Sequence, residues 1–154
     1  MEGLVWDELE VKISADALWD VYGTGKLGNL IPKLIPNIIN AIHFLEGDGA
    51  EGTVIHICFA PGTPGPSSYK ERFVKIDNEA RVKEALAIEG LKEFGFKKYL
   101  VRLEIQEKPG GISVIKSSIQ YEIDEEHAWT PPPITIMPFK LIAEKVANYL
   151  SESH

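Results

Sequence analysis

The pattern of apolar and polar residues along this chain predicts strands in seven stretches. One weak alternation covers residues 2–12 at the start of the sequence. The other six runs lie near residues 38–46, 52–60, 67–76, 81–89, 96–107 and 112–123. Short connections rich in glycine, proline, aspartate or asparagine separate these six runs. We therefore expect an antiparallel meander rather than parallel strands joined by helical crossovers.

Apolar residues at helical spacing predict three helices. Ser14 is expected to cap a short helix that ends near Tyr22. A second short helix is expected over residues 26–34, broken around Pro32 and stopped by Pro36. A long helix is expected near the C-terminus, with an apolar stripe along one side. The stripe comprises Ile134, Met137, Leu141, Ile142, Val146 and Leu150.

A sheet and a long helix that are each apolar on one side can bury both surfaces if the sheet curves around the helix. The sequence therefore predicts an α+β protein with a curved antiparallel sheet, two short helices after the first strand and a long C-terminal helix. Such an arrangement often leaves a hydrophobic cavity between helix and sheet, and Met137 and Leu141 are expected to contact a ligand there. Because no repeat or second composition is evident, residues 1–154 are expected to form one domain.

Composition and charge narrow the classes of function. Hydrophobic residues make up 44% of the chain and charged residues 25%, as in ordinary globular proteins. The 16 basic and 23 acidic residues give a net charge of −7, which disfavours a nucleic-acid partner. Neither a signal peptide nor a membrane-spanning run is evident, so a cytoplasmic protein without a membrane partner is expected, as a monomer or weak homodimer.

The sequence gives no support to metal or dinucleotide chemistry. The single Cys58 cannot form an internal disulfide, and the four histidines show no ligand spacing, so no metal is expected. Residues 47–53 carry the glycine spacing of a dinucleotide-binding loop. A strand rather than a helix follows them, so a hairpin loop is the better interpretation and no cofactor is expected.

The candidate catalytic residues lie on two neighbouring predicted strands. Because side chains alternate along a strand, Tyr69, Glu71 and Phe73 share one face. On the next strand Lys83 shares its face with the small residue Ala85. Charged residues are rarely buried, so periodicity alone favours a solvated face. If that face instead looks into a cavity, an acid and a lysine would meet over a small molecule, with Phe73 and Ala85 as ligand contacts.

Several motifs resemble the pathogenesis-related class ten proteins, the superfamily of the major birch pollen allergen. The similar blocks are residues 7–11, the glycine-rich loop 47–53, residues 69–79 and residues 114–118. The resemblance covers nearly the whole chain and implies the helix-grip fold, in which a seven-stranded sheet holds a long C-terminal helix. Within the superfamily, the chain is most similar to the branch of norcoclaurine and norbelladine synthases.

This branch implies an enzyme of plant alkaloid biosynthesis. Its members condense an aromatic ethylamine, tyramine or dopamine, with an aromatic aldehyde to an imine or a Pictet–Spengler product. Their catalytic tyrosine, glutamate and lysine fall on Tyr69, Glu71 and Lys83. The catalytic aspartate of the ring-closing members falls on Val101, which is then expected to contact the ligand. The norbelladine-forming relative also has an aliphatic residue there.

Two other functions remain open from the same resemblance. Many class ten relatives carry hydrophobic plant metabolites or hormones without changing them, and the predicted cavity would suit this role equally. Ribonuclease activity, reported for some relatives, is disfavoured by the acidic balance and by the lack of a His–His or Lys–His constellation. The enzyme is preferred over the carrier, and the choice depends on where Glu71 and Lys83 point.

Overall fold

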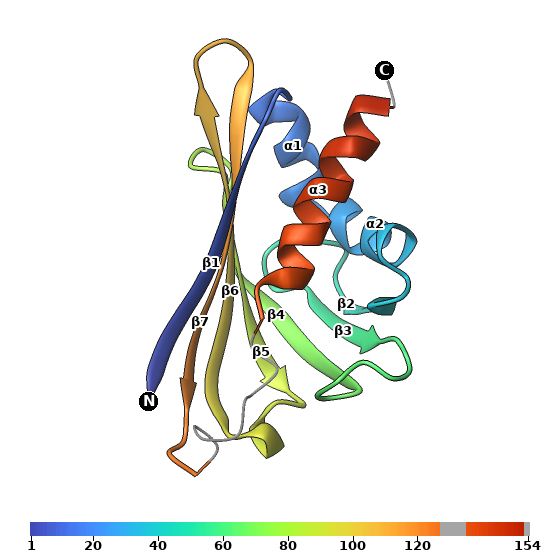
Figure 1. Cartoon of the computed structure of the whole chain (residues 1–154), viewed down its shortest axis with the longest axis vertical. Coiled ribbons are helices and arrows are strands. Elements are labelled where there is room, and N and C mark those ends of the chain that lie inside the picture. Colours follow the sequence, from blue (N-terminus) through green and yellow to red (C-terminus); the bar gives the residue numbers. More distant parts are fainter. Residues whose placement is uncertain (127–134, 153–154) are drawn as a thin grey trace.

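A computed structural model describes residues 1–126 and 135–152 of the chain, and it shows a curved sheet that holds a long helix (Figure 1). The elements in chain order are β1 (Glu2–Val11), α1 (Ala15–Tyr22), α2 (Lys26–Leu34), β2 (Ile39–Glu46), β3 (Val54–Phe59), β4 (Ser68–Asp77), β5 (Val82–Glu89), the short 3-10 helix η1 (Lys92–Phe94), β6 (Phe96–Lys108), β7 (Ile112–Ile123) and α3 (Met137–Glu152). Ile134, predicted as part of the apolar stripe, lies outside the described residues.

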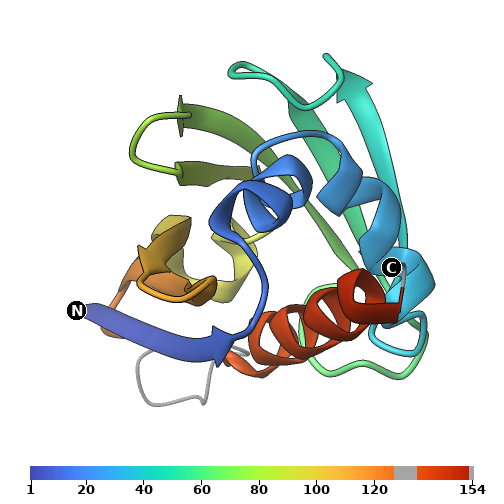
Figure 2. The ribbon, with the colours of Figure 1, turned by 90° about the horizontal axis from the view of Figure 1, so that it is seen from above.

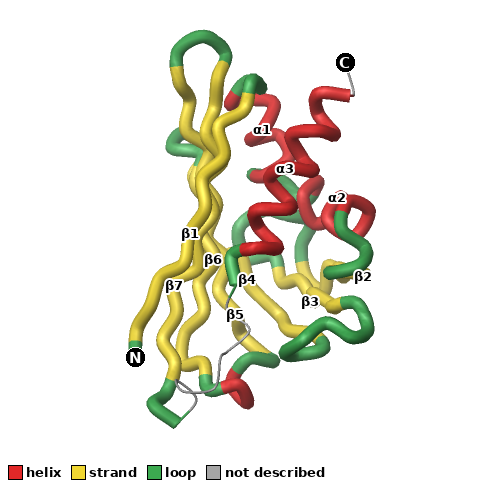
Figure 3. Tube along the Cα trace, in the orientation of Figure 1, coloured by secondary structure: helices red, strands yellow, loops and turns green. Residues whose placement is uncertain are grey.

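The seven strands form one antiparallel sheet in the order β1-β7-β6-β5-β4-β3-β2. Strands β2 to β7 are neighbours in sequence order, so the predicted meander is confirmed, and β1 returns to pair with β7. Seen from above, the sheet curls part of the way around α1 and α3 (Figure 2). The helices therefore cover the concave face of the sheet, as the secondary-structure colouring also shows (Figure 3). This is the predicted α+β helix-grip architecture.

The two short helices have the predicted bounds. The Ser14 side chain accepts a hydrogen bond of 3.1 Å from the N–H of Ala17, as expected of a helix cap. The predicted break at Pro32 is wrong, because α2 continues to Leu34. Pro32 stands in the last turn and removes only its own N–H from the ladder. The following turn still closes, since the N–H of Ile35 donates to the carbonyl of Ile31 at 2.9 Å.

The core lies between the concave face of the sheet and the helices. Leu18 of α1, Ile119 of β7 and Val146 of α3 are all fully buried there. Apolar burial of this kind stabilises each such side chain by about 1.5–3 kcal/mol and fixes how α3 sits on the sheet. None of the helices in the described part of the chain is long and apolar enough to cross a membrane.

Candidate active site

Strand β4 points its three predicted site residues inward. Tyr69, Glu71 and Phe73 are 6%, 7% and 3% exposed, while Lys70 and Arg72 lie on the outer side between them. Lys83 on the neighbouring strand β5 is only 4% exposed. The interpretation of this face as a solvated one is therefore wrong, because the curvature of the sheet puts it under the helices. A carboxyl and an amino group are both buried here.

The hydrogen bonds of these residues orient an acid and a base. The Tyr69 hydroxyl donates to Oε2 of Glu71 at 3.2 Å. The Lys83 Nζ donates to the backbone carbonyl of Tyr22 at 3.3 Å, at the C-terminal end of α1, where the helix dipole favours a cation. The same Nζ lies 4.0 Å from the centre of the Phe73 ring, within cation–π range. Both titratable groups are thus held by neighbours other than each other.

Burial moves the pKa values of the pair toward neutrality. Desolvation raises the pKa of Glu71 to about 7, although the charge of Lys83 and the hydrogen bond from Tyr69 act in the opposite direction. Desolvation lowers the pKa of Lys83 to about 8, and the charge of Glu71 opposes this shift. Near neutral pH each group can therefore take up or release a proton. Such perturbed values are typical of acid–base sites.

These residues line a cavity of about 100 Å³ between the sheet and helices α2 and α3. Three of the predicted ligand contacts, Phe73, Ala85 and Val101, lie in its wall together with the candidate catalytic residues. Val101 on β6 pairs directly with Ala85 on β5. The remaining wall is mostly apolar, and it comprises Leu27, Gly28, Ile31, Ile39, Ile42, Ile55, Ile57, Phe59, Tyr99, Leu103, Thr135, Pro138, Phe139 and Ile142.

The α3 residues in the cavity wall differ from the two that were predicted as ligand contacts. Within the described part of the chain, Met137 and Leu141 do not line the cavity, and Met137 is half exposed. Pro138, Phe139 and Ile142 line it instead, and of these Ile142 belongs to the predicted stripe. The stripe showed that α3 packs on the sheet. In the first turn of α3, the residues that face the cavity are Pro138 and Phe139 rather than Met137.

Sequence reasoning also missed Tyr99 of β6. Its ring packs edge-on against Tyr69, with 5.9 Å between the ring centres. Burial and the charge of Glu71 raise the pKa of its hydroxyl, so it stays protonated at neutral pH. A signal for it was present, since Tyr99 stands two residues before Val101 and must share its face of the strand.

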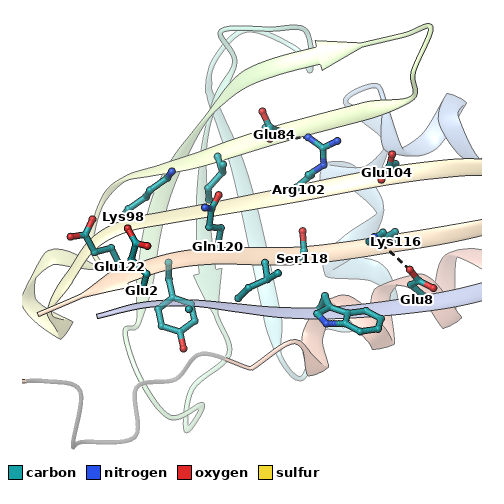
Figure 4. A pocket seen from close by; sticks show the side chains of 15 residues that line it. Glu2, Glu8, Glu84, Lys98, Arg102, Glu104, Lys116, Ser118, Gln120 and Glu122 are labelled. Atoms are coloured by element: carbon teal, nitrogen blue, oxygen red, sulfur yellow. Dashed lines mark hydrogen bonds and ion pairs between the residues drawn. The ribbon is translucent and has the colours of Figure 1, made fainter. Parts of the chain in front are cut away.

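A larger hollow of about 750 Å³ lies on the outer face of the sheet (Figure 4). Charged side chains make up about half of its wall. Two ion pairs form there, Arg102 with Glu84 at 3.1 Å and Lys116 with Glu8 at 3.6 Å. These charged side chains are partly exposed to solvent. The candidate active site is therefore the inner cavity, even though it is smaller.

A buried acid–base pair in an apolar cavity, enclosed by a helix-grip fold, defines the class of this protein. Residues 1–153 match the model of the pathogenesis-related protein Bet v 1 family. The chain belongs to this family, which confirms the resemblance seen in its motifs.

Individual relatives are similar over nearly the whole chain. The chain is 48% identical to norbelladine synthase of Narcissus pseudonarcissus over 151 residues, which are 97% of this chain and 93% of the relative. It is 40% identical to S-norcoclaurine synthase 2 of Papaver somniferum over 93% of its length, but spans only 63% of that relative. The structure of norcoclaurine synthase from Thalictrum flavum in complex with dopamine and hydroxybenzaldehyde superposes with a TM-score of 0.89, at 32% identity, over 100% of this chain and 89% of that one.

Proposed function

We propose that this protein is an enzyme that condenses an aromatic ethylamine with an aromatic aldehyde. The buried pair of Glu71 and Lys83 in an apolar cavity carries the proposal, because it offers a base and an acid at neutral pH. The substrate class is supported by the relative named norbelladine synthase and by the Thalictrum flavum structure with dopamine and hydroxybenzaldehyde. We propose tyramine or dopamine as the amine.

The reaction needs an acid for the loss of water. The amine nitrogen attacks the aldehyde carbon to give a carbinolamine, which then loses its hydroxyl as water and leaves an imine. In our proposal the Lys83 ammonium donates the proton to the departing oxygen. The carbonyl of Tyr22 and the ring of Phe73 hold this ammonium in place. A positioned acid of this kind typically contributes about 10²–10⁴-fold in rate.

The second role is that of base and counter-charge. The proton on the attacking nitrogen passes to the former carbonyl oxygen, which gives the neutral carbinolamine. The Glu71 carboxylate then stabilises the cationic iminium that forms as water leaves, and it accepts the N–H proton that the iminium releases to become the imine. The hydroxyl of Tyr69 fixes the orientation of this carboxylate through its 3.2 Å hydrogen bond. The surrounding apolar wall excludes water, which strengthens both electrostatic interactions.

A carrier of hydrophobic metabolites is the second candidate, because the wall of the cavity is mostly apolar. Burial of Glu71 and Lys83 favours the enzyme over the carrier. Buried charges are costly for a fold, and a site that only stores an apolar ligand gains nothing from an acid–base pair. The distinction is whether bound substrates react faster than in solution.

A direct assay separates the two functions. The protein is mixed with tyramine and 3,4-dihydroxybenzaldehyde in the presence of a mild hydride reductant, and the trapped secondary amine is measured over time. We expect formation well above the rate with heat-denatured protein. If the protein binds both compounds, as seen by quenching of its fluorescence, but leaves the rate at that of the control, the carrier is correct and the enzyme is not.

The rate is expected to depend on pH in a bell-shaped way. Activity should rise as Glu71, with its pKa near 7, loses its proton and becomes a base. It should fall again as Lys83, with its pKa near 8, loses the proton that it must donate. The profile of kcat/KM should therefore have a narrow optimum between these values. A flat profile from pH 6 to pH 9, about one unit beyond each of these two pKa values, would contradict the assigned roles.

Val101 is expected to limit ring closure. The resemblance implies an aspartate at this position in the ring-closing relatives, whereas Val101 has no lone pair and is 2% exposed in the cavity wall. Pictet–Spengler closure needs a base that removes a proton from the aromatic ring. Imine formation has no such step. With dopamine and 4-hydroxyphenylacetaldehyde we expect little or no norcoclaurine, measured by chiral chromatography. Rapid and stereoselective formation of that product would show that Glu71 alone suffices.

A further inference from the structure

The amine form of Lys83 is a feature that the proposed mechanism does not use. A lysine attacks a carbonyl carbon only as the neutral amine, which is scarce in water near neutral pH. Burial disfavours the charged form, so a lysine that is removed from water becomes a nucleophile more readily. Lys83 is 4% exposed and lines the mostly apolar inner cavity. Its surroundings therefore favour the reactive form.

The contacts of Nζ suit the neutral amine as well as the ammonium. An ammonium has three N–H donors, but among the described residues one hydrogen-bond acceptor contacts it, the carbonyl of Tyr22 at 3.3 Å. The neutral amine can still donate one N–H there, and its lone pair is then free for a bond to carbon. Desolvation lowers the pKa of Lys83 to about 8, and the charge of Glu71 opposes this shift without cancelling it. Roughly a tenth of these side chains are therefore neutral at pH 7.

Lysines on the outer face of the sheet have a different environment. Lys70 lies 2.8 Å from the carboxylate of Glu89 and Lys116 lies 3.6 Å from that of Glu8, and the two lysine side chains are 33% and 39% exposed. Water and an adjacent negative charge both stabilise the ammonium. Within residues 1–126 and 135–152, Lys83 is the one lysine in the wall of the inner cavity. An aldehyde that enters this cavity therefore meets a single primary amine.

We propose that Lys83 binds an aromatic aldehyde covalently, as an imine at Nζ, when the cavity holds no amine substrate. The identity of the aldehyde rests on the proposed function, whereas the nucleophile belongs to this chain. The neutral Nζ attacks the carbonyl carbon, and one N–H proton passes to the carbonyl oxygen to give a carbinolamine. Loss of the hydroxyl and of the second N–H proton as water leaves a carbon–nitrogen double bond. The reaction consumes no oxidant or reductant.

The same cavity supports this reaction and its reversal. Glu71 lines the same wall, and with a pKa of about 7 it can take up the proton that the nitrogen releases and pass it to the departing hydroxyl. The apolar wall excludes the water that hydrolyses imines in solution. An aromatic ethylamine that enters later can attack the same carbon and displace Nζ, which yields the condensation product and the free lysine. The imine is therefore a reversible store of aldehyde, and while it persists Lys83 cannot act as the acid.

The test is reductive trapping in the absence of an amine substrate. The protein is incubated near neutral pH with 3,4-dihydroxybenzaldehyde and a mild hydride reductant, which converts an imine to a stable secondary amine. Peptide mapping by mass spectrometry then locates the label, with the N-terminal amine as an internal reference because it is also partly neutral at this pH. We expect the rate of labelling at Lys83 to saturate with aldehyde concentration, since binding in the cavity precedes the reaction. Labelling of the N-terminal amine should rise in proportion to the aldehyde, and Lys70 should react at least about tenfold more slowly than Lys83.

A competing compound and two variants tie the label to the cavity. The compound 4-methylphenol has an aromatic ring but neither an aldehyde nor an amine, so it should slow the labelling of Lys83 and leave that of the N-terminal amine unchanged. Lys83→Met should remove the saturable labelling. Lys70→Met, on the outer face of β4, should retain it.

The outcomes separate this inference from the proposed function. If Lys83 stays unlabelled, or is labelled in proportion to aldehyde concentration as the N-terminal amine is, the imine is overturned. Turnover of amine and aldehyde is measured separately, so an unlabelled Lys83 in an active protein refutes the imine and leaves the proposed enzyme intact. Saturable labelling of Lys83 in a protein without turnover would confirm the imine and contradict the enzyme.

Discussion

Replacing Lys83 with methionine is expected to lower the condensation rate by about 10²–10⁴-fold while substrate binding is retained. Methionine keeps the length and the apolar stem of the side chain but cannot donate the proton that the departing oxygen needs. The residual rate should come from the cavity, which still holds amine and aldehyde together. The pKa of Glu71 should rise above 7, because the charge of Lys83 lowers it in the native protein.

An ion pair on the outer side of the same two strands gives matched controls. Lys70 of β4 and Glu89 of β5 meet at 2.8 Å on the outer side of the sheet, where both are partly or largely exposed. Lys70→Met removes a lysine in the same chemical way, but on the face of β4 that points away from the cavity. It should leave the rate within a factor of about two, since exposed pairs contribute little. Equal losses in Lys83→Met and Lys70→Met, or no loss in either, would contradict the assigned role of Lys83.

The sequence was sufficient to predict the order of the elements. Strand alternation and glycine-rich connections are local, so they placed β4 to within a residue of its observed ends. The effect of Pro32 was misjudged because propensity rules do not say how much of a helix follows a proline. Only two residues of α2 follow it, so the lost hydrogen bond costs little.

The candidate active site was harder to predict from the sequence alone. Alternation showed that Tyr69 and Glu71 share a face, but not whether that face is concave. The sign of the sheet's curvature relative to the helices decides this, and it depends on the packing of residues far apart in the chain. The resemblance to amine-condensing relatives pointed to the same residues. The side of α3 that meets the cavity, and hence Phe139 rather than Met137, depended on the same packing.

Replacing Glu71 with glutamine is expected to lower the rate by a similar factor and also to move the alkaline limb of its pH profile. Glutamine keeps the shape of the side chain and can still accept the hydrogen bond from Tyr69, but it is not a base. The negative charge of Glu71 raises the pKa of Lys83 in the native protein, in opposition to burial. Without this charge the pKa of Lys83 should fall below 8, because burial then acts unopposed.

The direction in which the alkaline limb of the pH profile moves distinguishes a direct role of Glu71 from a general loss of structure. A misfolded or loosened cavity would expose Lys83 to water and return its pKa toward the usual value of 10.5, which moves the limb to higher pH. A correctly folded variant without the carboxylate should move it to lower pH. The pH profile of the residual rate is the measurement, with Glu89→Gln on the outer side as the control that leaves rate and profile unchanged. A shift of the limb to higher pH in Glu71→Gln would contradict the electrostatic coupling between Glu71 and Lys83 on which the proposed mechanism depends.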